Sequence, residues 1–384
     1  MSKPVEKYIT VITSAYNAEK TLEHTIVSVR EQTYPHFEYL IIDHGSTDGT
    51  RKIIEKNCAE DSRLHLITIE KNTGFIGKAL NTGIRNASGE YICFLDSDDI
   101  YQKDFFENML KSVLHHKSDV GICGFAFYSE REGEIVETFV QDDRKMITYE
   151  DYQTYFCDQI SKEMFFSYID YYWNKFYRTE YLRKNNLFFP ENMFWLSDAR
   201  FNLNVLKTFP RIAFISVLGT IYTLSDKSTT SNWKIGLKRE FLDYASAWEN
   251  YLSRFIPVDI VLRNMGRSMP CINDFYKIAD ARNLQKDSIY ELIAWLEDGR
   301  GLYRKLLKAI NYDRKYLNNI EMTLVKFKNR YGALECEESI FLKYYNRYML
   351  KEDSEKYLQE IFQLIWHEDN IFSLGAQELT DMVL

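Results

Sequence analysis

Residues 91–99 read Tyr-Ile-Cys-Phe-Leu-Asp-Ser-Asp-Asp, an apolar run that ends in an acidic cluster. The apolar part is typical of a strand buried on both faces of a parallel sheet. Ligands of open α/β sheets bind beyond the carboxyl ends of the strands, so Asp96, Asp98 and Asp99 stand where a ligand is expected. Close carboxylates repel one another unless a cation is present, and hard oxygen ligands favour Mg²⁺ or Mn²⁺. The alternative, which suits an isolated motif better, is a solvated acidic turn that caps the next helix.

The flanking residues alternate short apolar runs with amphipathic stretches. This is the βαβ pattern of a mainly parallel sheet flanked by helices, which places the first part of the chain in the α/β class. From residue 146 to 233 the pattern is irregular, with helices expected near Tyr149 and from Thr179 and Asp198, and a strand over 172–177. Upstream we expect strands over residues 8–13, 37–43, 64–70, 91–95 and 120–128, and helices over 21–32, 50–57, 76–86 and 103–115.

Strand patterns end near residue 233, and helical periodicity returns over 237–253, 289–296, 316–330 and 354–366. We therefore expect a catalytic domain over 1–232 and an all-helical C-terminal domain over 233–384, joined near the polar stretch 225–232. Basic, aromatic segments at 302–308 and 312–316 favour amphipathic core helices. Contact with an acceptor, with an anionic membrane surface or with a second copy of the chain stays open for this domain.

Composition excludes several classes of protein. A net charge of -8 over 384 residues argues against a nucleic-acid partner, which would require an excess of Lys and Arg on one face. The six cysteines have neither zinc-ligand nor disulfide-framework spacing, so reduced thiols in the cytoplasm fit best. No apolar stretch is long enough to span a bilayer, and we expect a cytoplasmic protein or one held peripherally at the inner face of the cell membrane.

Polar residues also follow the other strands. Tyr16 comes after the first strand and suits contact with a flat base, and Asp43 and His44 end the second. For the turn 46–48, capping of the following helix explains the side chains about as well as ligand binding does. Lys78, on the helix after the third strand, suits phosphate, although an exposed helix lysine is the commoner explanation.

These segments resemble the successive motifs of family 2 glycosyltransferases with the GT-A fold, of the bacterial surface-polysaccharide type. The resemblance covers roughly residues 5–232. It rests on Thr-Ser-Ala-Tyr-Asn at 13–17, Asp-His-Gly-Ser-Thr-Asp-Gly-Thr at 43–50, Asn-Thr-Gly at 81–83, Phe-Leu-Asp-Ser-Asp-Asp at 94–99, Trp-Asn-Lys-Phe-Tyr-Arg at 173–178 and Leu-Ser-Asp-Ala-Arg at 196–200.

The resemblance implies an inverting transfer of a sugar from a nucleotide-diphosphate sugar, foremost a UDP-sugar, to a hydroxyl of a glycan, lipid-linked or cell-surface polymer acceptor. In that case Asp198 is the general base, and Mn²⁺ or Mg²⁺ on the diphosphate is held by Asp98, Asp96 and Asp99. The predicted donor-binding residues are Thr13, Ala15, Tyr16, Asn17, Asp43, His44, Lys78, Asn81, Asp96 and Ser97.

Two departures affect this expectation. The family usually has an acidic residue at the position of His44, which contacts the nucleotide base, so the base and the sugar stay open. No histidine lies between His116 and His367 to act as a late metal ligand.

Three other kinds of protein could share parts of this pattern. A nicotinamide-dependent dehydrogenase needs a G-x-G-x-x-G turn after the first strand, which is missing here, and a nucleotidyltransferase needs a basic Gly-rich loop there. A non-catalytic nucleotide-sugar or glycan-binding protein on a degenerate transferase scaffold remains the alternative from another class.

Overall fold

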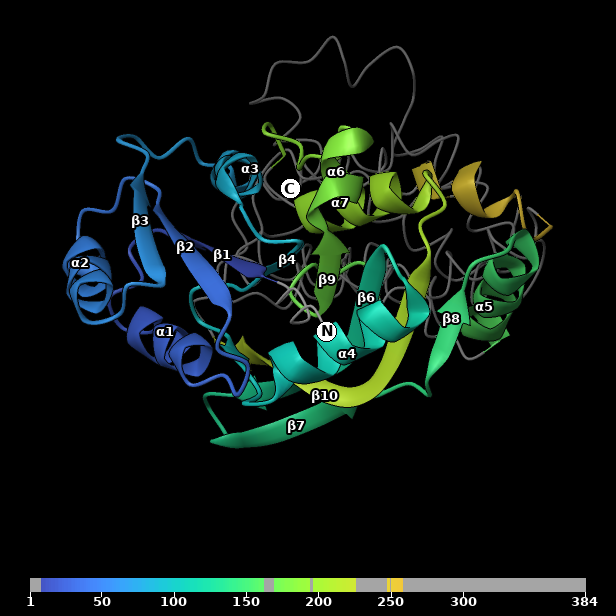
Figure 1. The fold of residues 1–384 in the computed structure, drawn as a ribbon, viewed down its shortest axis with the longest axis horizontal. Helices are drawn as coiled ribbons and strands as arrows, with labels where there is room; N and C mark the ends of the chain where they lie inside the picture. Colours follow the sequence, from blue (N-terminus) through green and yellow to red (C-terminus); the bar gives the residue numbers. More distant parts are fainter. Residues whose placement is uncertain (1–7, 162–168, 194–195, 226–246, 249, 258–384) are drawn as a thin grey trace, which may run out of the picture. The chain divides into compact units, whose positions relative to one another are not determined.

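The computed structural model describes residues 8–161, 169–193, 196–225, 247–248 and 250–257 (Figure 1). The chain divides into two compact units, one of Met1–Tyr155 with Phe166–Asn232, the other of Phe156–Phe165 with Trp233–Leu384. Every predicted site residue belongs to the first unit. The domain boundary at 232 stays a prediction, and most of the helices expected beyond it lie outside the described residues.

A ten-stranded mixed sheet forms the centre of the first unit. Its main path runs in the order β3-β2-β1-β4-β9-β6-β10-β5, with β7 paired to β6 and β8 paired to β10. The strands are β1 (Ile9–Ala15), β2 (Phe37–Asp43), β3 (Leu64–Thr68), β4 (Tyr91–Phe94), β5 (Ile100–Tyr101), β6 (Val120–Ser129), β7 (Glu134–Phe139), β8 (Arg144–Met146), β9 (Lys175–Arg178) and β10 (Ile212–Leu224).

The strand directions decide where the site lies. Strands β1, β2, β3 and β4 are parallel, so their carboxyl ends share one edge of the sheet. Strand β9 runs antiparallel between β4 and β6, with Tyr91 opposite Arg178 and Ile122 opposite Lys175. The residues that lead into β9 therefore reach the same edge as the acidic cluster that follows β4.

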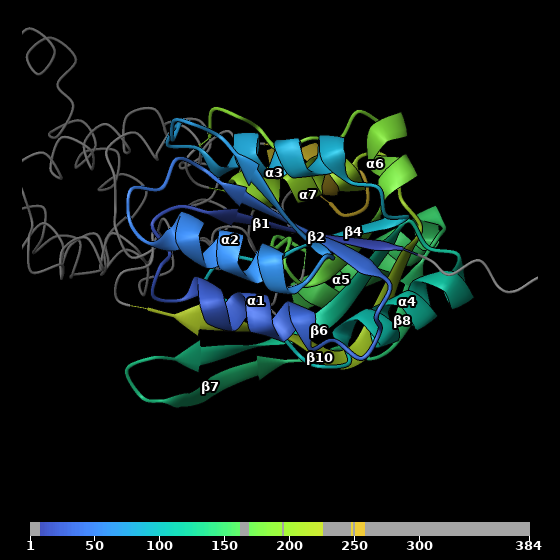
Figure 2. The same ribbon diagram turned by 60° about the vertical axis from the view of Figure 1, so that its left-hand side comes forward.

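Seven helices are described, and they cover both faces of the sheet (Figure 2). Figure 2 shows α3, α6 and α7 on one side and α1 and α2 on the other. The side chains of α1, α2 and α4 share one hydrophobic core with the sheet. The helices are α1 (Leu22–Arg30), α2 (Thr50–Glu60), α3 (Ile76–Asn86), α4 (Phe105–His116), α5 (Tyr149–Ser161), α6 (Thr179–Lys184) and α7 (Ser197–Leu206).

The opposite face of the sheet is packed with aromatic rings. Phe94 of β4 is fully buried and makes edge contacts with Tyr172, Tyr177 and Phe189 at ring-centroid distances of 5.2 to 5.7 Å. Phe189 stacks on Phe201 of α7 at 3.9 Å. Such rings are bulky and have few rotatable bonds, so this core fixes α7 relative to the end of β4.

The strands and helices expected up to residue 128 are confirmed to within a few residues. Four strands were not expected, namely β5, β7, β8 and β10. Strand β7 is exposed along most of its length and so lacks an apolar alternation. Strand β10 contains register shifts between Ile215 and Thr220, which interrupt the period of two that identifies a strand.

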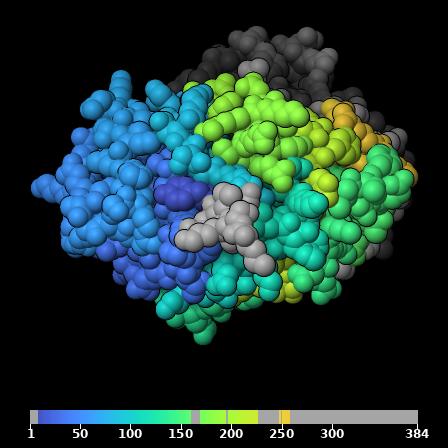
Figure 3. Space-filling model, in the orientation of Figure 1, coloured from blue at the N-terminus to red at the C-terminus, as the bar shows by residue number. Residues whose placement is uncertain are grey.

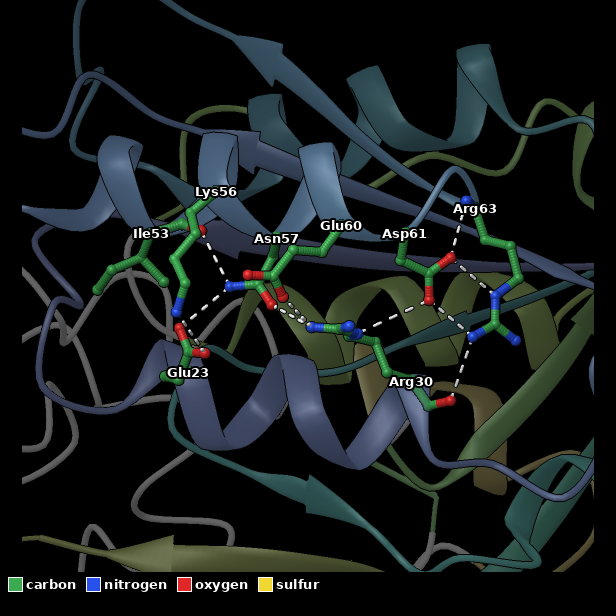
Figure 4. Close-up of polar contacts among 8 residues, drawn as sticks. All are labelled: Glu23, Arg30, Ile53, Lys56, Asn57, Glu60, Asp61 and Arg63. Carbon is green, nitrogen blue, oxygen red and sulfur yellow. Dashed lines mark hydrogen bonds and ion pairs between the residues drawn. The ribbon is translucent and has the colours of Figure 1, made fainter.

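A polar network joins α1 to α2 and to the loop before β3 (Figure 4). Asn57 donates to Glu23 at 3.0 Å and accepts from Arg30 at 2.8 Å, while Arg63 bonds Asp61 at 2.7 Å. Asn57 is fully buried, so these bonds satisfy an amide that water cannot reach. The network fastens the two helices together on the face away from α3.

In the space-filling view, which has the orientation of Figure 1, the blue segments from the start of the chain lie beside the green segments that follow (Figure 3). Within the described residues, no helix combines the length and the apolar character needed to cross a bilayer.

Candidate functional site

The acidic cluster lies on the loop between β4 and β5, at the carboxyl edge of the parallel strands. Asp96, Ser97 and Asp98 are partly exposed, whereas Asp99 is fully buried. The loop is anchored by two backbone bonds, because the Leu95 N–H donates to Ile12 at 3.0 Å and the Asp99 N–H donates to Asp96 at 3.2 Å. The continuous apolar strand thus ends in two partly exposed carboxylates, Asp96 and Asp98, and one buried carboxylate, Asp99.

Two contacts hold the carboxylates. The Tyr172 hydroxyl donates to Asp96 Oδ1, and the backbone N–H of Thr223 in β10 donates to Asp99 Oδ1 at 2.8 Å. Asp99 Oδ2 is buried and has no hydrogen-bond partner. The cluster is therefore fixed from two sides, by the segment before β9 and by the end of β10.

The electrostatics of the loop disfavour three charged carboxylates. Burial raises the pKa of Asp96, Asp98 and Asp99 above the ordinary aspartate value. Mutual repulsion adds to this effect, since Asp98 raises the pKa of Asp96, and both raise that of Asp99. A bound cation would offset both contributions.

Asp198 is the second residue of α7 and lies near this cluster. Leu196 has a left-handed backbone with φ 55° at the helix start, so Asp198 sits in the first turn and is not the N-cap residue. Burial raises the pKa of Asp198 to about 6, against the lowering effect of two backbone hydrogen bonds and of Lys175. Asp198 in turn raises the pKa of Asp96, which places the two carboxylates within electrostatic reach of each other. A carboxylate of this kind suits general-base chemistry near neutral pH.

Residues 170–175 contact both the acidic loop after β4 and the start of α7, which carries Asp198. We refer to these residues as the strap. At one end of it the Asn202 amide of α7 donates to the carbonyls of Asp170 at 2.8 Å and Asp198 at 3.1 Å. Further along, Tyr172 bonds Asp96. The strap thus fixes the distance between the start of α7 and the loop after β4.

The loops after β1 and β2 form the neighbouring part of the edge. The Tyr16 side chain is 47% exposed and therefore accessible to a ligand. Asn17 has φ 49° and its side-chain oxygen accepts from the Thr47 N–H at 2.9 Å. Asp43 is fully buried, where it accepts from Arg51 at 2.7 Å and from the Ser46 N–H at 3.0 Å. Asp43 therefore shapes the turn that follows β2.

His44 follows Asp43 directly at the start of this turn, within reach of the charge of Lys78. His44 is 3% exposed, and its Nε2 accepts from the Thr73 N–H at 3.3 Å. Burial, followed by the charge of Lys78, lowers the pKa of His44, so the ring is neutral at pH 7. Because Nε2 is the acceptor, the proton of the neutral ring is on Nδ1.

Three further predicted donor-binding residues, in addition to Asp43 and His44, are buried. Ala15 is fully buried, and so is Thr13, whose hydroxyl donates to the Leu95 carbonyl at 2.8 Å. Asn81 donates to Phe189 and Glu191 at 2.9 Å and accepts from the Phe189 N–H at 2.8 Å. Both N–H groups of the Asn81 amide donate to protein groups, so this residue of α3 holds the segment near Phe189 in place.

The carboxylates only partly fit a metal. Among the described residues, no group of three or more His, Cys, Asp or Glu side chains is arranged to hold one. The predicted set of Asp96, Asp98 and Asp99 is not assembled, because Asp99 is buried and turned toward the backbone of β10. Asp98 and Asp96 remain as an oxygen-only pair, and Mg²⁺-type ions bind through one or two carboxylates with the remaining ligands from phosphates and water. The pair therefore fits a cation that is shared with a diphosphate.

Sequence reasoning did not identify Tyr172, Asp170 or Asn202 as part of the site. The motif at 173–178 marked the neighbourhood, but the pairing of Tyr172 with Asp96 depends on the insertion of β9 between β4 and β6. In the sequence, nothing about a tyrosine just before a short strand indicates that it bonds an aspartate on a distant loop.

The sequence comparisons agree with one another in what this chain is similar to. Residues 10–185 match the model of glycosyl transferase family 2. Over 143 residues the chain is 35% identical to the Bacillus subtilis (strain 168) glycosyltransferase TuaG, whose name refers to teichuronic acid biosynthesis. That match covers 37% of this chain and 56% of TuaG, so the chain spans only about half of this relative.

Two solved structures share the fold. The Staphylococcus aureus TarS fragment 1–349 in complex with UDP-GlcNAc superposes with a TM-score of 0.61 at 19% identity, over 84% of this chain and 91% of that one. The mannosyltransferase PcManGT from Pyrobaculum calidifontis, in complex with GDP-Man and Mn²⁺, gives 0.50 at 16% identity, over 83% and 87%. These likenesses establish the α/β fold expected from the sequence.

Proposed function

We propose that this protein, whose residues 10–185 match the model of glycosyl transferase family 2, transfers a sugar from a nucleotide-diphosphate sugar to a hydroxyl of a bacterial glycan, lipid-linked or cell-surface polymer acceptor. One observation carries the proposal. The segment 170–175 joins the acidic loop to the first turn of α7, because Tyr172 bonds Asp96 and Asn202 bonds the carbonyls of both Asp170 and Asp198. A donor diphosphate and an acceptor hydroxyl require two such groups side by side.

In this proposal Asp198 is the general base of an inverting reaction. Its pKa of about 6 leaves it mostly ionised at pH 7, yet more basic than an ordinary aspartate. It accepts the proton of the acceptor hydroxyl as that oxygen bonds to the anomeric carbon, and the nucleoside diphosphate leaves from the opposite face. A positioned base contributes about 10²- to 10⁴-fold in rate.

The donor occupies the edge formed by the loops after β1, β2 and β4. Tyr16 is the exposed ring available to the base. Lys78 is close enough to His44 to lower its pKa by charge. The TarS structure contains UDP-GlcNAc and the PcManGT structure contains GDP-Man, so the fold accommodates either a uracil or a guanine base.

Mn²⁺ or Mg²⁺ bound by Asp98 and Asp96 would neutralise the leaving diphosphate. The mutual repulsion of these carboxylates supports the presence of such an ion, as does the Mn²⁺ in the PcManGT complex. The Tyr172 hydroxyl orients Asp96, and the strap keeps this pair at a fixed distance from Asp198.

A thermal-shift panel of UDP-, GDP-, CDP- and dTDP-sugars with Mn²⁺ tests the donor, because a ligand of the native state raises the unfolding midpoint. The best donor is then used with Asp198→Asn, which we expect to lose transfer by about 10²-fold or more while its donor affinity stays unchanged. Asp104→Asn, an exposed aspartate at the start of α4, is the matched control.

A donor that binds but is neither hydrolysed nor transferred by the wild type would favour the non-catalytic binding protein instead. If donor affinity fell as much as the rate of transfer in a well-folded Asp198→Asn variant, this would contradict the assignment of Asp198 to the acceptor side.

A further inference from the structure

Asn81 of α3 is a buried polar side chain whose contacts argue against the role that the family resemblance implies for it. The resemblance assigns Asn81 to the donor site, yet the side chain is 1% exposed. One N–H of its amide donates to the Phe189 carbonyl and the other to Glu191 Oε1, both at 2.9 Å. A donor could therefore bind these N–H groups only by displacing a protein acceptor.

The amide of Asn81 also fixes the backbone of Phe189. The Phe189 N–H donates to Asn81 Oδ1 at 2.8 Å, so the side chain of one residue and the backbone of the other exchange two hydrogen bonds. Two bonds to one residue fix the orientation of its backbone as well as its distance from α3. Both residues are buried, so breaking this pair would leave polar atoms without partners and without water.

Helix α3 lies directly against the segment that contains Phe189. A Cβ on Gly77, one turn before Asn81, would lie 2.2 Å from the Pro190 carbonyl oxygen. Farther out, Arg85 and Glu191 form an ion pair at 3.3 Å, with side chains that are 55% and 45% exposed, so this pair contributes little. The buried amide and the close backbone approach are thus the main contacts that hold the segment on α3.

Phe189 connects this segment to α7. Its ring stacks on Phe201 at a centroid distance of 3.9 Å, with an angle of 11° between the planes, and both rings are buried. Phe201 comes three residues after Asp198, and residues at this spacing are neighbours on one face of a helix. Closely packed rings transmit a displacement, so a shift of Phe189 would move the part of α7 that carries Asp198.

Asn202 provides a separate attachment of α7. Its amide donates to the Asp170 carbonyl in the strap, and its side-chain oxygen accepts from the Tyr177 hydroxyl at 2.7 Å. Neither bond involves α3. The position of Asp198 thus depends on both attachments, and the one through Phe201 leads back to Asn81.

We propose that Asn81 is a positioning residue for Asp198, which holds Phe189 against Phe201 and so fixes the first turns of α7, and that it does not bind the donor. The inference rests on the proposed function, in which Asp198 acts on the acceptor hydroxyl. Loss of Asn81 should then slow transfer from a bound donor, whereas loss of a donor-binding residue should weaken donor binding.

The test measures kcat at saturating donor, and the dissociation constants of UDP and GDP with Mn²⁺, for the wild type, Asn81→Ala and Asn86→Ala. Asn86 is an exposed asparagine of α3 whose amide donates to the Thr82 carbonyl of the same helix at 2.8 Å, so Asn86→Ala is the matched control. We expect kcat to fall about tenfold to a hundredfold in Asn81→Ala, because a small misplacement of a base slows the reaction strongly, while the dissociation constants stay unchanged. Asn86→Ala should match the wild type in both quantities.

Two results would overturn the inference. A raised dissociation constant, with or without a fall in kcat, would return Asn81 to the donor site, and unchanged values of both would show that α7 does not depend on it. Glu191→Ala removes one partner of Asn81 at the surface and is used if Asn81→Ala does not fold. For this variant we expect a smaller fall in kcat at an unchanged dissociation constant, and the same two results would count against the inference.

Hydrogen exchange separates this inference from the proposed function, since it needs no substrate. We expect the backbone N–H groups of Ser197–Leu206 to exchange faster in Asn81→Ala than in Asn86→Ala, while those of β1 and β2 keep the protection of the wild type. If the wild type transfers no sugar, the proposed function fails, and this comparison alone decides whether Asn81 holds α7. Equal protection of α7 in the two variants would show that it does not.

Discussion

Lowering the pH from 7.5 to 5 should inactivate the enzyme through protonation of Asp198. With a pKa of about 6, this carboxylate is ionised in roughly 97% of molecules at pH 7.5 and in roughly 9% at pH 5. The rate depends on the ionised form, so kcat/KM should fall about tenfold. An aspartate at its ordinary value would still be about 90% ionised at pH 5 and would lose almost nothing.

The direction follows from the cause of the shift. Burial favours the neutral acid, so the pKa of Asp198 rises, and activity is lost as the pH falls through about 6. The groups whose pKa is coupled by charge to that of Asp198 are Asp96, Lys175 and the hydroxyls of Tyr171, Tyr172 and Tyr177.

The assay is release of nucleoside diphosphate coupled to transfer, at saturating Mn²⁺ and with the donor selected by the thermal-shift panel. Donor affinity is measured at each pH, because protonation of Asp96 and Asp98 would also weaken metal and donor binding. A midpoint below about 4.5, with donor affinity constant over the range, would refute the placement of a buried base at Asp198.

Three further outcomes are expected from substitutions. Asp98→Ala should weaken Mn²⁺-dependent binding of the nucleoside diphosphate, and calorimetry that gives the same affinity with and without metal would exclude the metal pair. Tyr172→Phe removes the hydroxyl that holds Asp96 and should raise the donor dissociation constant about threefold to tenfold, the equivalent of one ordinary hydrogen bond; an unchanged constant in titrations of the folded variant would argue against this orienting role. Gly83→Ala places a Cβ 2.4 Å from Ile12 Cγ2, so urea denaturation should show that the free energy of unfolding falls by about 1 kcal/mol. Helix propensity alone predicts the opposite, a stabilised variant, and that result would disprove the close approach.

The parallel half of the sheet was predictable because β1, β2 and β4 are buried almost throughout, which gives continuous apolar runs, and the helices between them are amphipathic. Phe37–Asp43 and Ile76–Asn86 were expected with the bounds that the structure has. Strand β10 could not be recognised in the same way, since its bulges near Gly219 interrupt the alternation, and β7 lacks an apolar face.

The candidate site was predictable as a set of loops and less so as a set of contacts. The sequence placed Asp96, Asp98 and Asp198 correctly at strand and helix ends, although their roles remain predictions. It could not show that Asp43 forms an ion pair with Arg51, because that pair depends on the conformation of the turn after β2. The pairing of Tyr172 with Asp96 likewise depends on long-range strand order and not on any local pattern.

The two bonds that hold the acidic loop also set the time at which it can form. Asp96 is bonded by a residue 76 positions later, and Asp99 by Thr223, 124 positions later. At typical rates of protein synthesis, Thr223 leaves the ribosome on the order of ten seconds after Asp99. Contacts between residues so distant in the chain form late in folding, since closing the intervening loops costs entropy first. A fragment that ends at residue 185 contains Tyr172 but neither Asp198 nor Thr223, so it has the strands of the parallel half without a completed acidic loop.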